Sequence, residues 1–393
     1  MNKAILNIEI QDFIDNHIDS DITSILLSGI HFLHVETKDL IEQIEAKKRC
    51  QKKLPTWFNT KAIYYPNKLN IEQTSSEITA SYKSKLITGN SIIDLTGGFG
   101  VDCFYFSKQF KTVVHCELNT HLSELVAHNL KQLDVNNIET QNCDGIQYLT
   151  KSNKPFDWVY ADPSRRHSSK GKVFFLNDCL PNIPEQLPAI FKYTENILIK
   201  TSPLLDLSVG ISELQFVKTI HIVAVNNEVK ELLWILKKDN THGITIKTAN
   251  IIKDDIIHFE FLLENEKDVD ADYSNPLSYL YEPNAAILKA GAFNSIAKQM
   301  NVFKLQKHSH LYTNEILIDF PGRRFKIENV LPYNTKNIKK LGIGKANITI
   351  RNFPETVQQI RKKLNLKDGG DAYLFFTTDK NLNRIVVITS KIQ

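Results

Sequence analysis

The chain has 393 residues, more than one typical domain, so we expect two or three domains. Its hydrophobic fraction of 42% and its net charge of +4 are ordinary for a globular protein that buries a core. No apolar run approaches the ~18 residues that a membrane-spanning helix needs, and the N-terminus lacks a signal-peptide core. We therefore expect a cytoplasmic protein without membrane contact.

The five cysteines are scattered, without the paired spacing that zinc sites and redox motifs show. They are Cys50, Cys103, Cys116, Cys143 and Cys179. Several lie in apolar strand or helix contexts, which indicates small core residues. We predict no disulfide framework and no metal site.

Residues 1–72 have a mainly helical pattern and carry no recognisable chemistry. The basic run KKRCQKK at 47–53 is typical of a solvated helix face, with contact to phosphate as the alternative. Thr74, followed by Glu77 three residues later, has the spacing of a capping box. A helix is therefore expected to begin there and to end near Gly89.

An apolar run followed by three glycines is the most informative stretch, SIIDLTGGFGVD at 91–102. The run reads as a buried strand that ends at Asp94, and Gly97, Gly98 and Gly100 indicate a backbone that turns tightly and approaches a ligand. The next residues are apolar at helical spacing, so the glycines lie between a strand and a helix, as in nucleotide-binding units. A glycine-rich turn without a ligand is the alternative.

The details of this loop argue against two phosphate-binding motifs. The dinucleotide fingerprint requires a glycine where Cys103 stands, and the P-loop requires a Gly-Lys-Ser/Thr ending that is absent here. The carboxylate of Asp94 would repel a pyrophosphate, but it can accept hydrogen bonds from an ammonium group, directly or through water. S-adenosylmethionine (SAM), an amino acid joined to adenosine without phosphate, fits such a loop.

Acidic residues also end the later strands. The apolar strand at 111–118 carries Glu117 near its end, where a carboxylate can accept hydrogen bonds from both ribose hydroxyls; a solvated strand-end charge is the alternative. An amphipathic helix over 120–133 and a short strand follow. The fourth strand, FDWVYA at 156–161, runs into Asp-Pro-Ser-Arg-Arg at 162–166. In a doubly wound sheet, such a strand end lies beside the ligand.

The loop from Asp94 to Asp102, Glu117 and the Asp-Pro-Ser-Arg-Arg run together resemble class I SAM-dependent methyltransferases that carry a C-terminal THUMP-like domain. The stretch EQTSSEITASYK at 72–83 adds to the resemblance, which covers most of the chain. The resemblance implies an α/β fold with a seven-stranded Rossmann-like sheet whose last strand is antiparallel. It also implies an N-terminal helical region and a small C-terminal α+β THUMP-like domain.

The resemblance implies a set of SAM-binding residues. In many such enzymes the segment before the first strand closes over the methionine end of SAM, so Ser76, Thr79 and Lys83 are candidates; a helix that only covers the sheet edge is the alternative. Asp144 falls where these enzymes contact the adenine amine, although Asp before Gly is also an ordinary turn signal. The predicted set is Thr79, Asp94, Thr96, Gly97, Gly98, Gly100, Asp102, Glu117 and Asp144.

The predicted catalytic residues are Asp162, Pro163, Ser164 and Arg165. Methyl transfer is an in-line displacement in which the enzyme mainly positions the reactants. The Asp162 carboxylate and the Pro163 carbonyl can accept the protons of an exocyclic amine and direct its lone pair toward the methyl group. Related enzymes have Asn/Asp-Pro-Pro-aromatic here, so Ser164 and Arg165 depart from the pattern. Arg165 can stack on a base or pair with phosphate, and a purely structural role for it and Arg166 is the alternative.

The C-terminal half changes in organisation. Strand-like segments complete the sheet at about residue 240, and an acidic run at 264–276 reads as a linker or exposed loop. A helical segment and short strands, among them ILIDF at 316–320, come next. We predict four regions: an N-terminal helical region (1–72), a methyltransferase domain (73–240), a β-rich and small α+β connecting unit (241–320) and a basic THUMP-like α+β domain (321–393).

Positive charge is concentrated in the last region. Residues 321–393 hold about 15 Lys and Arg against about 5 Asp and Glu, whereas the whole chain has a net charge of only +4. Such an excess of positive charge can neutralise several phosphates of a nucleic acid. The alternative is a domain that is basic but does not bind a nucleic acid. The candidate residues are Arg323, Arg324, Lys326, Lys336, Lys339, Lys340, Lys345, Arg351, Arg361, Lys362 and Lys363.

We therefore predict a SAM-dependent methyltransferase that acts on a base nitrogen in RNA, either tRNA or rRNA, with the basic domain presenting the RNA. Two alternatives stay open: a methyltransferase of a protein or small molecule, and a non-catalytic RNA-binding module. A dehydrogenase is the least favoured class because the glycine spacing is wrong for it. The sequence indicates neither the modified nucleotide nor the oligomeric state.

Overall fold

The computed structural model describes residues 1–27, 29, 31–165 and 175–392. Arg166 and the polar loop at 167–172 lie outside the described residues. By its internal contacts the chain divides into two compact units: residues 1–218 with 232–241, and residues 219–231 with 242–393. No helix within the described ranges is long and apolar enough to cross a membrane.

The first unit begins with short helices, as predicted. They are η1 (Lys3–Leu6), α1 (Ile8–Asn16), α2 (Ile22–Leu27), α3 (Thr37–Lys53), α4 (Pro55–Asn59) and α5 (Lys68–Gln73). Their apolar side chains share one core with residues of the glycine loop and the helices that follow it. The buried Trp57 ring, for example, meets the edge of Phe104 with 4.9 Å between ring centroids. The N-terminal helices therefore pack directly on the loop region instead of forming a separate body.

The helix before the first strand differs in its ends from the prediction. It is α6 (Glu77–Ser84), and Ser76 caps it by accepting a hydrogen bond from the Thr79 backbone N–H. The predicted capping box from Thr74 to Glu77 is wrong. The Glu77 carboxylate instead accepts hydrogen bonds from the backbone N–H and hydroxyl of Thr56 and from the hydroxyl of Tyr105. Because the Glu77 carboxylate accepts these three hydrogen bonds, it cannot also cap the N-terminus of α6.

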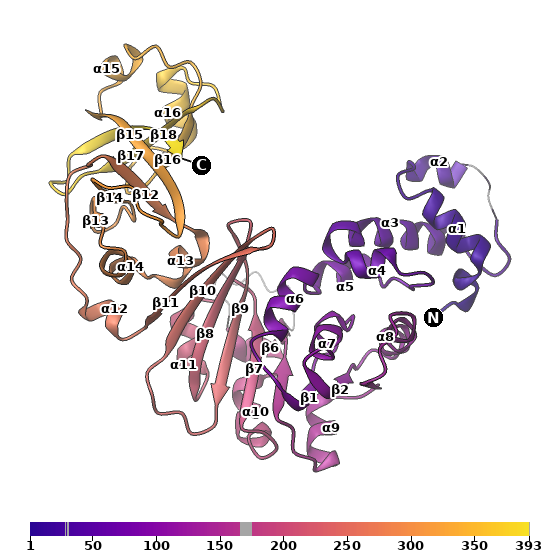
Figure 1. Ribbon diagram of the computed structural model, residues 1–393. Helices are drawn as coiled ribbons and strands as arrows, with labels where there is room; N and C mark the ends of the chain where they lie inside the picture. The colour runs from indigo at the N-terminus through magenta and orange to yellow at the C-terminus, as the bar shows by residue number, and fades with distance from the viewer. Residues whose placement is uncertain (28, 30, 166–174, 393) are drawn as a thin grey trace. The chain divides into compact units, whose positions relative to one another are not determined.

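A mixed sheet organises the catalytic region (Figure 1). Its order is β11-β10-β8-β9-β7-β4-β1-β2-β3. The strands are β1 (Gly89–Asp94), β2 (Phe110–Cys116), β3 (Ile138–Gln141), β4 (Trp158–Ala161), β7 (Asn196–Thr201), β8 (Val217–Val225), β9 (Glu228–Lys237), β10 (Thr245–Ile252) and β11 (Asp255–Leu262). The pairs from β3 through β7 are parallel, and β9 is antiparallel to β7, which confirms the predicted α/β class and its antiparallel last strand.

The sheet has nine strands instead of the seven predicted. The additional two, β10 and β11, were expected in a connecting unit beyond residue 240. They extend the sheet because β10 pairs in parallel with β8, and most of its apolar side chains are buried, as those of β8 are. A parallel edge strand buried on both faces needs another strand beside it, and β10 supplies one.

The connections of this region are mostly helical. They are α7 (Val101–Phe106), α8 (Thr120–Gln132), α9 (Gly145–Ser152), η2 (Leu176–Asp178), α10 (Ile183–Ile190) and α11 (Leu207–Glu213). A short antiparallel pair, β5 (Ser164–Arg165) with β6 (Cys179–Leu180), follows β4. The helices thus alternate with the parallel strands, as this fold class requires.

A second sheet forms the C-terminal part of the other unit. Its order is β13-β14-β12-β15-β18-β17-β16. The strands are β12 (Tyr279–Pro283), β13 (Phe303–Lys304), β14 (Tyr312–Asn314), β15 (Gly322–Pro332), β16 (Asn347–Ile350), β17 (Ala372–Thr378) and β18 (Arg384–Ile392). The helices are α12 (Asn265–Asp268), α13 (Ala285–Ala290), α14 (Phe293–Gln299), α15 (Thr335–Lys339) and α16 (Val357–Leu364).

After Arg323 the elements follow in the order β15, α15, β16, α16, β17 and β18, as an α+β domain requires. One expectation for the residues before Arg323 is wrong. ILIDF at 316–320 is not a strand. The acidic run at 264–276, predicted as a linker or exposed loop, is mostly exposed, but it contains the short helix α12, where the Glu266 carboxylate accepts hydrogen bonds from the backbone N–H groups of Asn294 and Ser295. A carboxylate at the first turn of a helix, here α14, is favoured by the unpaired amides there. The four sequence-based domain boundaries stay predictions.

Candidate active site

The glycine loop follows β1 and leads into α7. Gly98 and Gly100 have φ angles of 56° and 76°, a left-handed backbone that favours glycine. Gly97 is required for another reason: a Cβ atom there would lie 2.4 Å from Nε2 of His115. His115 is buried beneath the loop, and this burial lowers its pKa to about 4, so the imidazole is neutral at pH 7. The loop thus rests on a neutral, tightly packed ring.

Asp94 is buried at the end of β1, with 1% of the residue exposed. Its Oδ1 accepts hydrogen bonds from the backbone N–H and the hydroxyl of Thr96 at 2.8 and 3.0 Å, and its Oδ2 accepts from the Cys103 thiol at 3.3 Å. Burial raises the pKa of Asp94 to about 7. These contacts organise the turn from inside, and the predicted bond to an ammonium group stays a prediction.

Thr96 links the glycine loop to the predicted catalytic residue. Its hydroxyl donates to Asp94 and accepts a hydrogen bond from the backbone N–H of Asp162 at 2.8 Å. The end of β4 is therefore fixed directly against the end of β1. The spacing of the sequence motifs did not indicate this bond, although both motifs were expected at the same edge of the sheet.

Asp102, in the first turn of α7, is the centre of a buried network. Its Oδ1 accepts from Lys83 Nζ at 2.8 Å, and its Oδ2 accepts from the hydroxyls of Tyr160 and Ser75 at 2.7 and 3.0 Å. The Lys83 side chain is 0% exposed. Burial acts to raise the pKa of Asp102, but the ammonium groups of Lys83 and Lys200 outweigh it and hold that pKa below its ordinary value. The carboxylate is ionised and fully engaged.

Glu117 follows β2 and faces the glycine loop. Its Oε2 accepts from the Gly98 backbone N–H at 3.0 Å, and its Oε1 accepts from the Asn119 backbone N–H at 2.7 Å. A carboxylate oxygen can accept more than one hydrogen bond, so both oxygens keep capacity for the hydroxyls of a ribose. The structure therefore brings this predicted residue to the loop in a fixed orientation.

Two further predicted residues have clear local roles. Asp144 caps α9 by accepting from the Gln147 backbone N–H at 2.9 Å, and a Cβ atom at Gly145 would lie 2.5 Å from the Leu95 backbone. This close approach holds Asp144 beside the end of β1. Thr79 is buried in α6, where its hydroxyl interacts with the cap residue Ser76. Their predicted contacts with SAM stay predictions.

The predicted catalytic run follows β4 directly. The carboxylate of Asp162 forms an ion pair with Lys200, which lies in β7, the neighbouring strand. Within the described ranges, Oδ1 of Asp162 has no hydrogen-bond partner. Pro163 is buried, Ser164 is exposed and starts the short strand β5, and Arg165 pairs through its backbone with Cys179. The Arg165 side chain lies outside what the structure describes.

Sequence reasoning missed three members of this site. Lys200 had only one signal, its position near the end of a predicted strand beside the strand of Asp162. Tyr160 and Ser75 looked like ordinary strand and loop residues, yet they bond to the same carboxylate as Lys83. A buried lysine needs a partner, but the burial of Lys83 is visible only in the structure, so the sequence carried no signal for Ser75 and Tyr160.

The described residues fit a SAM molecule. The two carboxylate oxygens of Glu117 could accept hydrogen bonds from ribose hydroxyls beside the loop. At Gly98 the loop carries no side chain, and a Cβ atom there would meet only the Thr96 carbonyl oxygen, at 3.6 Å. The unobstructed loop and the strand-end carboxylate are what an adenosine ligand without phosphate requires. The loop at 95–100 contains no lysine that could bind a phosphate group.

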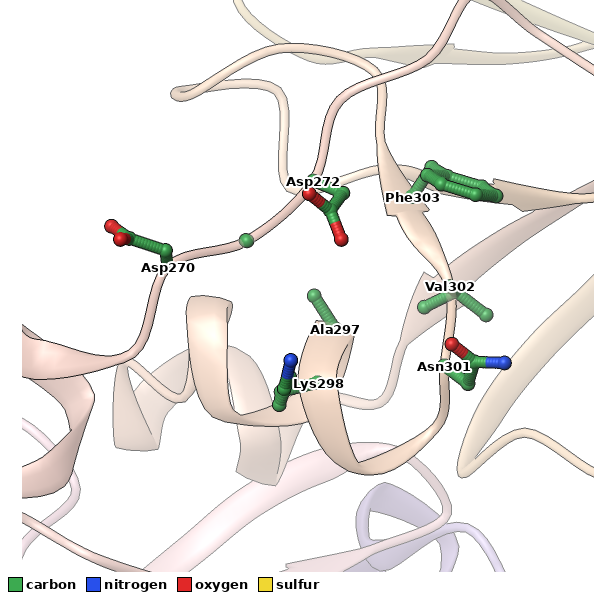
Figure 2. A pocket seen from close by; sticks show the side chains of 8 residues that line it. Asp270, Asp272, Ala297, Lys298, Asn301, Val302 and Phe303 are labelled. Carbon is green, nitrogen blue, oxygen red and sulfur yellow. The ribbon is translucent and has the colours of Figure 1, made fainter.

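A separate hollow lies in the C-terminal unit, between the segment before β12 and α14 (Figure 2). It is lined by Asp270, Ala271, Asp272, Ala297, Lys298, Asn301, Val302 and Phe303. Its volume of about 80 Å³ is too small for a nucleoside. Nowhere in the described part of the chain do three His, Cys, Asp or Glu side chains gather to hold a metal ion.

Two family models match the C-terminal half. A ferredoxin-like domain family matches residues 279–321, and a THUMP domain-like family matches residues 322–391. The second match confirms the predicted THUMP-like domain. Both matched segments lie in one sheet, because β12 of the first pairs with β15 of the second.

Known proteins resemble both the whole chain and its catalytic region. A solved structure from Porphyromonas gingivalis W83, described as a candidate methyltransferase, is 29% identical, covers 100% of both chains and has a TM-score of 0.89. The ribosomal RNA small subunit methyltransferase J of Francisella tularensis subsp. novicida U112 is 24% identical over 44% of this chain and 73% of its own. The protein of the same name from F. tularensis subsp. tularensis SCHU S4 gives the same values.

The fold and these similarities are those of a methyltransferase. More specifically, the chain is a SAM-dependent methyltransferase with a C-terminal THUMP-like domain.

Proposed function

We propose that the protein transfers a methyl group from SAM to a base nitrogen of tRNA or rRNA, and that residues 321–393 bind the RNA. The observation that carries this proposal is the placement of Asp162. Its backbone is bonded to the glycine loop through Thr96, its carboxylate is held by Lys200, and one carboxylate oxygen is left for a substrate. Such a target also implies a cytoplasmic location.

The loop residues would hold the cofactor by its sugar and its amino acid. Glu117 would accept hydrogen bonds from the ribose hydroxyls, while Gly98 lets the backbone approach and Asp144 lies toward the base. Bound SAM supplies an electrophilic methyl group on a sulfonium. The Lys83 and Asp102 network would act indirectly, by fixing α6 against α7 on either side of the loop.

At the reacting nitrogen, Oδ1 of Asp162 would accept a hydrogen bond from the exocyclic amine and so direct the lone pair. Transfer of the methyl group would leave a positive charge on the nitrogen. Its surplus proton then passes to Oδ1 of Asp162 and on to solvent. Lys200 keeps the other oxygen occupied, so that the carboxylate presents one defined acceptor.

RNA is supported as the substrate by three features. The region at 321–393 carries the excess of positive charge, it matches a THUMP domain-like family, and a relative of the catalytic region is named as a ribosomal RNA methyltransferase. Because one chain carries both parts, RNA bound by the basic region has a raised effective concentration at the enzyme.

The test is transfer of label from methyl-labelled SAM to total cellular RNA, followed by digestion to nucleosides. Asp162→Ala should abolish transfer while SAM affinity, measured by calorimetry, stays nearly unchanged. Asp178→Asn, which removes an exposed carboxylate elsewhere in this unit, is the matched control and should keep full activity. Equal loss of SAM binding in Asp162→Ala would contradict the assigned role. Label that appears in protein or small molecules but never in RNA would contradict the proposed substrate.

A further inference from the structure

A buried carboxylate in the C-terminal unit is held by two arginines. Glu282 lies in β12, and Arg323 is directly opposite it in β15. Nε of Arg323 donates to Glu282 Oε2 at 2.7 Å, and its Nη2 donates to the same oxygen. Nη2 of Arg351, just after β16, donates to Oε1 at 2.8 Å. The cluster carries two positive charges against one negative charge.

The two arginines are not enclosed with the carboxylate. The Glu282 side chain is 3% exposed, whereas those of Arg323 and Arg351 are 38% and 33% exposed. Across the residues that the structure describes, Nη1 of each arginine has no hydrogen-bond partner, and Nε of Arg351 is buried without one. A guanidinium has five N–H donors, so this cluster keeps donors that the protein itself does not satisfy.

The orientation of the arginines is fixed without a ligand. The Arg323 guanidinium lies over the Phe325 ring, with its Cζ 5.5 Å from the ring centroid. Asn352, next to Arg351, donates to Gln306 Oε1 at 2.9 Å and to the hydroxyl of Thr378. Planar donors that are already oriented lose little entropy when they bind an oxyanion.

We propose that Arg323 and Arg351, held apart and oriented by Glu282, form a binding site for a phosphodiester of the RNA backbone. Phosphate oxygens match the forked geometry of arginine, and one phosphate would neutralise the net charge of the cluster. A brace that only joins strands would not account for the buried Nε–H of Arg351, which has no partner among the described residues. The site is composite, because Glu282 belongs to the ferredoxin-like segment and both arginines belong to the THUMP-like segment. The inference rests on the proposed RNA substrate.

The experiment measures the affinity of the full chain for a fluorescein-labelled RNA hairpin by anisotropy, over a series of KCl concentrations. Arg323→Gln and Arg351→Gln should each weaken binding roughly tenfold and reduce the slope of log affinity against log salt by about 1. Lys247→Gln is the control, because Lys247 is a partly exposed lysine of β10 that pairs with Glu260 and lies outside the basic region at 321–393. It should leave affinity and slope nearly unchanged.

A conservative variant separates charge from geometry. Arg351→Lys keeps the charge and should keep the salt slope, but it should lose most of the affinity that the forked donors supply. Thermal melts of every variant confirm that the protein is folded when it is assayed. If the wild type binds the hairpin and both glutamine variants keep its slope and affinity, the cluster is a brace and this inference fails, while the proposed function stands. If the wild type shows no salt-dependent binding to RNA, the RNA substrate itself fails.

Discussion

Two carboxylates, one in each unit, are neutralised by cations that differ in how far the protein encloses them. Asp102 in the catalytic unit is paired with Lys83, a fully enclosed lysine whose ammonium donates to Asp102, Ser75 and Tyr160. Glu282 in the C-terminal unit is paired with arginines of which a third or more of the side chain is exposed. The ammonium N–H donors of Lys83 all bond within the protein, whereas some guanidinium N–H donors of Arg323 and Arg351 bond to no described residue.

This difference separates a structural network from a candidate binding site. A lysine has three N–H donors, and the partners of Lys83 account for all of them, so no ligand is needed. Some N–H donors of the arginines in the Glu282 cluster have no partner among the residues that the structure describes, and these arginine side chains are partly exposed. The buried cluster should therefore govern stability and loop geometry, whereas the exposed cluster should govern affinity for an anion.

The largest expected effect is that of Lys83→Met, which leaves the Asp102 carboxylate buried without its cation. Breaking a buried pair from one side costs about 3–5 kcal/mol, so the free energy of unfolding measured in urea should fall by that amount. Lys48→Met, which removes an exposed ion pair with Asp19, should cost less than about 1 kcal/mol. Adding Asp102→Asn to Lys83→Met should restore part of the loss; no recovery would mean that the charge of Asp102 is not the cause.

Next is Gly97→Ala, which tests whether the loop rests as tightly on His115 as the structure indicates. The new Cβ atom would lie 2.4 Å from the imidazole, and such overpacking costs about 1–3 kcal/mol. His115→Ala in the same chain should relieve the clash, so the double variant should be more stable than the sum of the two single effects predicts. Additive effects in urea unfolding would contradict the contact.

The sequence was sufficient for much of the fold because its signals are local. The apolar runs at 91–95 and 111–118, the glycines between them and the acidic strand ends all follow from neighbouring residues. The two additional strands were missed because nothing local distinguishes an edge strand of one sheet from a strand of the next domain. That assignment depends on the pairing of β10 with β8.

The candidate site divides in the same way. Asp94, Glu117 and Asp162 could be predicted because each ends a recognisable strand. Lys200 and Tyr160 could not, because they reach the site from other strands through contacts between residues far apart in the chain. The prediction of a capping box failed for a related reason. Glu77 has the correct spacing, but its carboxylate accepts hydrogen bonds from Thr56 and Tyr105, which are distant in the sequence.

A smaller effect, dependent on pH, is expected for Asp94→Asn. Burial raises the pKa of Asp94 to about 7, so the folded protein keeps a proton that the unfolded chain loses at about pH 4. The stability from this neutral carboxyl is fully present below about pH 4 and is lost as the pH rises through about 7. The wild type should therefore lose about 1–2 kcal/mol relative to Asp94→Asn between pH 6 and pH 8. Parallel unfolding curves across that range would contradict the raised pKa.

The smallest change in stability is expected for Arg351→Gln, and it tests the comparison most directly. Glu282 would still be paired with Arg323, and the lost arginine is partly exposed, so the free energy of unfolding should fall by only about 1 kcal/mol. Removing Arg323 as well leaves a buried carboxylate without a cation, so Arg323→Gln with Arg351→Gln should cost clearly more than the two single changes together. Glu282→Gln should rescue that double variant. Arg351→Gln should therefore lower RNA affinity strongly but stability only slightly. A large loss of stability in Arg351→Gln alone would show that this arginine mainly braces the fold.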